Sequence, residues 1–110
     1  MPIYHYTRIL PAENACFISS TDSGLLTSLS NELSSAFPEA LVEYQSLPSN
    51  ELYHLAAQFW KLKPKDAAEQ ASLCFETWLR YLCSRGWEPF AVHAAGEYAS
   101  STNYHFRMLR

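Results

Sequence analysis

A chain of 110 residues, 48% hydrophobic and 15% aromatic, is long enough for one domain with a real core and too apolar for an intrinsically disordered protein. Its net charge is −3 and it holds no run of Lys or Arg, so we do not expect it to bind nucleic acid. Its start lacks the regions of a signal peptide and no apolar run is long enough to cross a membrane, so we expect a cytoplasmic protein.

The first half of the chain predicts two strands around a helix. Residues 2–10 are β-branched and aromatic and predict a strand. The segment "ENACFISS" that follows fits a short strand or an extended connection. Leucines then recur at helical spacing between Asp22, a helix-capping residue, and Pro38, which ends the helix. Residues 39–47 predict a second strand.

The second half predicts two helices and a hairpin. Residues 49–63 carry Leu and Phe at helical spacing and predict a helix. Residues 65–85 predict the longest helix, and Gly86 stands where a helix C-cap favours glycine. Residues 87–94 and 103–109 predict an antiparallel hairpin. Its symmetrical register pairs apolar residues on a core face: Phe90 with Met108, Val92 with Phe106 and Ala94 with Tyr104.

These elements predict the fold class. We expect an α+β fold with a mainly antiparallel sheet of about four strands and two to three helices packed on one face. Residues 1–110 form a single domain in this interpretation. The sequence leaves the strand order open, and it does not say whether residues 11–64 are an insertion or the functional half.

The C-terminal segment resembles a known family. A helix ending in "RYLCSRGWEPFAV", then a turn, then "YHFRMLR", is similar to small bacterial domains of unknown function. Their signature is a helix, Gly-Trp-Glu, a short apolar strand and a final strand that ends in aromatic and basic residues. The likeness covers residues 75–110 and extends to the aromatic strand at residues 3–10, although Pro89 and Phe90 depart from the pattern. It implies a fold fragment and supplies no catalytic residues.

Histidines form the sharpest chemical constellation in the sequence. His93 and His105 oppose each other in the predicted hairpin, and His5 shares their face if the tyrosines beside it point into the core. Three imidazoles make a sufficient Zn²⁺ site with one open position. Ordinary surface histidines explain the same pattern more simply, so we expect no cofactor and keep zinc as the alternative.

Other catalytic motifs are missing from the sequence. The three cysteines, Cys16, Cys74 and Cys83, have neither a disulfide framework nor CxxC spacing, which indicates reduced thiols used for packing. The chain has no Walker loop, GxGxxG, GxSxG or HExxH motif. We therefore assign no catalytic residue.

Aromatic residues are more numerous than a modest core needs. Tyr53 and Trp60 share one face of the helix expected at 49–63, and Tyr81 leaves the main apolar stripe of the helix at 65–85. Aromatic side chains outside a core often anchor protein interfaces. Burial of a helix on two sides within the chain explains them equally well.

Three functional hypotheses remain. The first is a small interaction or regulatory module that binds a protein partner or its own copy through Tyr53, Trp60 and Tyr81, or through a sheet edge. The second is a metal-dependent or small-ligand enzyme that uses histidines on the open sheet face. The third is a small viral or plasmid-borne inhibitor of a host protein.

Overall fold

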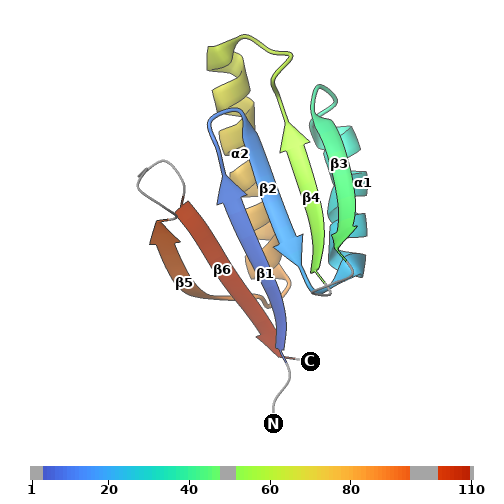
Figure 1. The fold of residues 1–110 in the computed structure, drawn as a ribbon, viewed down its shortest axis with the longest axis vertical. Helices are drawn as coiled ribbons and strands as arrows, with labels where there is room; N and C mark the ends of the chain where they lie inside the picture. Colours follow the sequence, from blue (N-terminus) through green and yellow to red (C-terminus); the bar gives the residue numbers. More distant parts are fainter. Residues whose placement is uncertain (1–3, 48–51, 95–101, 110) are drawn as a thin grey trace.

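The computed structural model describes residues 4–47, 52–94 and 102–109, and Figure 1 shows their arrangement as one sheet with two helices. The elements are β1 (Tyr4–Pro11), β2 (Ala15–Ser20), α1 (Ser23–Ala36), β3 (Leu41–Leu47), β4 (Leu52–Gln58), α2 (Pro64–Ser84), β5 (Glu88–Ala94) and β6 (Thr102–Leu109). The strand order is β3-β4-β2-β1-β6-β5, and all neighbouring strands are antiparallel. Three hairpins therefore lie side by side, and each helix connects one hairpin to the next.

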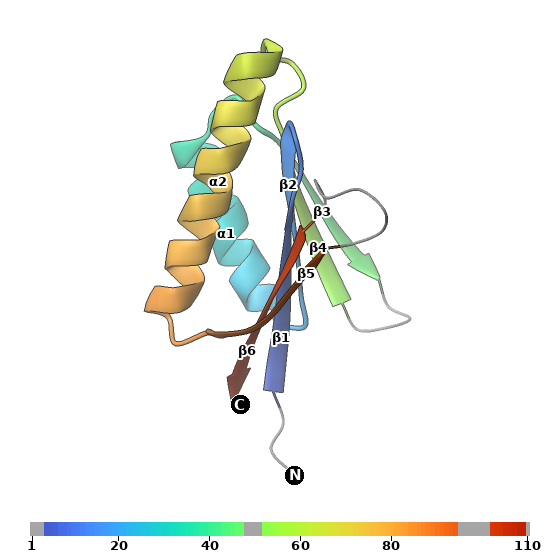
Figure 2. The same cartoon turned by 90° about the vertical axis from the view of Figure 1, so that its left-hand side faces the viewer.

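The two helices lie on the same face of the sheet (Figure 2). Among the described residues, no helix or strand covers the other face. We call the two sides the helix-covered face and the open face. Because successive side chains of a strand point to opposite sides, every strand contributes residues to both faces.

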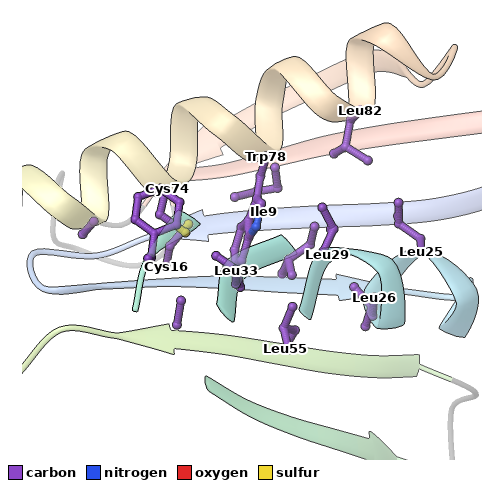
Figure 3. Packing of buried hydrophobic residues seen from close by; sticks show 14 of the residues in the cluster. Ile9, Cys16, Leu25, Leu26, Leu29, Leu33, Leu55, Cys74, Trp78 and Leu82 are labelled. Carbon is purple, nitrogen blue, oxygen red and sulfur yellow. The ribbon is translucent and has the colours of Figure 1, made fainter. Parts of the chain in front are cut away.

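The core lies between the sheet and the helices (Figure 3). Ile9, Ile18 and Leu55 oppose one another on β1, β2 and β4, and none is more than 1% exposed. Trp78 of α2 is also 1% exposed and lies above this row. Burial of each such side chain contributes on the order of 1.5–3 kcal/mol to stability.

The helix ends follow the local sequence signals. Asp22 caps α1 and accepts hydrogen bonds from the backbone N–H groups of Gly24 at 3.1 Å and Leu25 at 3.3 Å. Pro64 opens α2, and Gly86 follows it with φ +89°, a left-handed conformation that favours glycine. Neither helix, of the two that the described residues form, combines the length and the hydrophobicity needed to cross a membrane.

The predicted sheet of about four strands with two to three helices is wrong. The described residues form an α+β fold with six strands and two helices, and the expected helix at 49–63 contains β4 instead. The buried side chains Leu55, Ala57 and Phe59 alternate along this segment, as in a strand. In so short a segment the apolar residues fit both a helical spacing and the alternation of a strand. Pairing with β2 and β3 satisfies the backbone hydrogen bonds of β4 on both sides, which favours the strand.

The β5–β6 hairpin also differs from the expected register. Pro89 opposes Phe106, Val92 opposes Tyr104 and Ala94 opposes Thr102. The ladder is irregular around Phe90, whose ring turns to the open face. Phe106 is buried as expected, but Phe90 is 45% and Val92 59% exposed, so the expected core position is wrong for both. The irregularity comes directly after Pro89 in the strand, because proline has no backbone N–H and cannot donate a ladder hydrogen bond.

Candidate functional site

Four polar residues form a line across the open face. Arg8 on β1 opposes Ser19 on β2 and His105 on β6, and Ser19 opposes His54 on β4. Their neighbours along these strands, such as Ile9, are buried against the helices, so alternation places the four side chains on the open face. We call Arg8, Ser19, His54 and His105 the polar row.

Ser19 and His54 are joined at one end of the polar row. Ser19 Oγ and His54 Nδ1 share a hydrogen bond of 2.6 Å, and Ser19 is only 3% exposed. The other ring nitrogen of His54, Nε2, is buried without a hydrogen-bond partner in the described structure. Burial lowers the pKa of His54 below its usual value, and the charge of Arg8 lowers it further. The imidazole is therefore neutral at pH 7.

Tyr6 and His105 form a second hydroxyl–imidazole pair at the other end. Tyr6 Oη and His105 Nδ1 share a hydrogen bond of 2.5 Å, and the two rings stack with centroids 5.8 Å apart. Burial raises the pKa of Tyr6, an effect that the charge of Arg8 opposes in part. The tyrosine hydroxyl therefore keeps its proton at neutral pH and can take part in the hydrogen bond as a neutral group.

Two arginines on the open face differ in their partners. Arg107 of β6 forms an ion pair with Glu88 of β5, with Nε and Oε2 3.3 Å apart. Arg8 is partly buried and forms no ion pair with any residue that the structure describes. Among the described residues, no carboxylate forms an ion pair with the positive charge of Arg8 in the middle of the open face.

A hollow lies beside His54 on the open face. It has a volume of about 370 Å³ and is lined by Phe17, Glu43, His54, Ala56 and Gln58 together with parts of Ile18 and Leu55. Phe17, Ala56 and Glu43 oppose one another across β2, β4 and β3. The hollow thus offers one aromatic wall, one amide and one carboxylate next to the polar row.

Exposed aromatic and aliphatic residues gather at the other side of the open face. Tyr4 is 44%, Phe90 45% and Leu109 61% exposed, and Tyr4 opposes Leu109 in the β1–β6 ladder. The guanidinium of Arg107 lies 5.3 Å from the ring centroid of Tyr4 and 5.3 Å from that of Phe90. Tyr6 lies 6.3 Å from Phe90, centroid to centroid. We call Tyr4, Tyr6, Phe90, Arg107 and Leu109 the aromatic surface.

The histidines proposed for zinc do not meet on one face. His5 lies on the helix-covered face, where its ring centroid is 6.3 Å from that of Trp87, whereas His105 lies on the open face. His93 opposes Asn103 in the β5–β6 ladder, but its side chain lies outside the described residues. The condition for that site was that Tyr6 points into the core, but Tyr6 shares the open face with His105. Within the described part of the chain, no three His, Cys, Asp or Glu residues gather as metal ligands.

The aromatic residues proposed as partner anchors do not form one surface. Tyr53 lies near the start of β4, whereas Trp60 lies in the turn after its end and is 54% exposed. Tyr53 and Tyr81 are partly buried and pack against the core. The argument that placed Tyr53 and Trp60 on one helix face is wrong, because residues 52–58 form a strand.

The cysteines occupy two kinds of environment. Cys16 of β2 and Cys74 of α2 are buried together in the core, and Cys83 is exposed. Burial raises the pKa of the Cys16 thiol far above its usual value, and contact with Cys74 raises it further. Cys16 is therefore a packing residue in its thiol form, not an activated nucleophile.

No protein-family model matches the chain, and no curated protein matches it either. The resemblance to the small bacterial domains therefore stays a prediction.

Sequence reasoning missed most of the polar row and the aromatic surface. The apolar spacing of residues 49–63 predicts a helix for His54, and no motif in the sequence marks Arg8 or Ser19. The alternation of Tyr4, Tyr6 and Arg8 with Thr7 and Ile9 in the first strand is the one local signal that places them on a common face. It does not tell which strands lie beside them.

Proposed function

We propose that this protein is a small interaction module that self-associates through its aromatic surface. The observation that carries the proposal is the exposure of Tyr4, Phe90 and Leu109 around Arg107, on a sheet face that no described element covers. Tyrosine and arginine are among the residues that contribute most binding energy at protein interfaces. Exposed apolar side chains in contact with one another typically mark such interfaces.

The charges of this surface favour a second copy as the partner. Among the described residues, Arg107 is the charged residue of this surface, and it already pairs at 3.3 Å with Glu88 on the neighbouring strand. In a two-fold arrangement the same patch meets itself, so Glu88 of each copy can lie opposite Arg107 of the other. A strongly acidic or basic partner would find no excess of opposite charge there.

The test is sedimentation velocity over a range of protein concentrations. We expect a reversible dimer, and we expect Phe90→Gln to weaken it about fivefold or more, since an interface anchor contributes more than about 1 kcal/mol. Val92→Gln is the matched control. Val92 is on the same strand and is 59% exposed, but it opposes Tyr104, whose ring contacts Phe75 of α2 and so lies on the helix-covered side.

Two results would contradict the proposal. A protein that stays monomeric at all concentrations has no such self-association, and the aromatic surface would then need a different partner. A dimer that Val92→Gln weakens as much as Phe90→Gln uses another face. Melting temperatures of both variants must stay close to that of the unchanged protein, so that an effect on assembly is not an effect on folding.

A further inference from the structure

Arg8 and Arg107 both lie on the open face, but they differ in whether a carboxylate pairs with them. Arg8 is a partly buried residue, its cross-strand neighbours are the uncharged Ser19 and the imidazole of His105, and no carboxylate pairs with it among the residues described. Removal of a cation from water is costly unless a counter-charge is nearby. Arg107, on the neighbouring strand, has such a partner in Glu88.

Groups suited to an anion stand on both sides of Arg8. Neighbouring strands lie about 5 Å apart, so His105 is adjacent to Arg8 and His54, two strands away, is within reach of its long side chain. Ser19 holds His54 through Nδ1, which leaves the buried Nε2 without a described partner. Tyr6 Oη shares a hydrogen bond with Nδ1 of His105. Each imidazole is thus held by a hydroxyl on the open face, in the same cross-strand row as Arg8.

We propose that Arg8, flanked by His54 and His105, binds an oxyanion of a small ligand, a phosphate or a carboxylate, whose remaining part occupies the hollow beside His54. The planar guanidinium matches either anion with two parallel hydrogen bonds. Phe17 supplies an apolar wall for the body of the ligand, and Gln58 supplies an amide. Glu43, at the far side of the hollow, disfavours a second anionic group there.

The lowered pKa of His54 supports this assignment. Burial and Arg8 hold the ring neutral in the ligand-free protein. A bound anion would offset the charge of Arg8 and favour the protonated ring. The site does not require self-association, because it is centred on β1, β2 and β4 and its occupancy can be measured on whichever oligomer the chain forms.

The experiment is a titration with inorganic phosphate and, separately, with acetate, followed by the NMR signals of the histidine rings. Ionic strength is held constant with sodium chloride, so that general screening does not change. We expect saturable shifts of the His54 and His105 signals and a rise in the pKa of His54. Stronger binding of one anion identifies whether the site is built for a phosphate or a carboxylate.

Two arginine variants provide the matched comparison. Arg8→Gln should weaken binding about tenfold or more, the usual effect of losing a charge-assisted hydrogen bond, and Arg8→Lys should restore part of it. Arg107→Gln should leave the affinity nearly unchanged. The proposal is overturned if neither anion shifts the His54 signals, or if Arg8→Gln and Arg107→Gln weaken binding equally, which would indicate general charge attraction. Circular dichroism of each variant shows whether it is folded.

Discussion

Ser19 and His54 share a 2.6 Å hydrogen bond across β2 and β4. The bond joins two strands that are far apart in the sequence. On their helix-covered face, the same two strands form the centre of the core. It satisfies Nδ1 of His54 and leaves Nε2 buried without a described partner. The same contact therefore contributes to stability and positions a histidine in the same cross-strand row as Arg8.

Removal of the Ser19 hydroxyl should destabilise the protein. Ser19→Ala leaves His54 Nδ1 without its partner in a partly buried position, which should cost about 1 kcal/mol. Urea denaturation measures the change in the free energy of unfolding. Ser34→Ala is the control, because its hydroxyl bonds to a backbone carbonyl on the exposed side of α1, and we expect a change within about 0.5 kcal/mol. Equal effects of the two substitutions would argue against a stabilising Ser19–His54 bond.

His54 should make stability depend on pH. Its pKa in the folded protein is lowered, below the value of about 6.5 in the unfolded chain, so the unfolded state binds more protons in the range between the two values. The stabilisation is complete above about pH 6.5 and is lost as the pH falls through this range. Urea unfolding at about pH 7.5 and pH 5.5 should show a smaller loss of stability for His54→Gln than for the unchanged protein. An identical loss would mean that His54 does not titrate as described.

Leu55 tests the position of β4 against the core. Leu55→Ala removes a side chain that is 1% exposed and opposes Ile18, and it should cost about 2–5 kcal/mol in urea denaturation. Leu73→Ala is the control, since Leu73 of α2 is 44% exposed. Little effect at position 55 would place this side chain outside the core.

The cysteines should differ in reactivity. In the native protein a chromogenic aromatic disulfide should react rapidly with the exposed Cys83 and not with the buried Cys16 and Cys74, because buried thiols stay protonated and out of reach. Cys83→Ser should abolish the rapid reaction, and all three thiols of the unchanged protein should react in denaturant. Rapid native reaction of the Cys83→Ser variant would show that the core opens readily.

The sequence predicted those elements whose signals are local. Asp22 and the leucines of α1 are close to one another in the sequence, and Gly86 comes shortly after the end of α2. Both helices form where these local signals predict them. β4 could not be assigned in this way, because Leu52, Leu55 and Phe59 fit a helical spacing and only pairing with two other strands selects the extended form.

The candidate site depends on contacts between distant segments. Arg8, Ser19, His54 and His105 come from four strands, and no spacing in the sequence specifies that these strands are neighbours. The β5–β6 hairpin was expected from its sequence, but the irregularity at Phe90 turned one expected core residue into part of the aromatic surface. A shift of one residue in the pairing of a strand is enough to move its side chains to the other face of the sheet.

The most direct test of the open face as the binding face compares the methyl groups of Leu109 and Val92. They are 61% and 59% exposed and belong to opposite faces of the same hairpin. With a soluble paramagnetic agent, NMR relaxation measures how well solvent reaches each methyl group. We predict that Leu109 becomes protected as the protein concentration rises while Val92 stays accessible. Protection of Val92 instead, or of neither residue, would contradict the account.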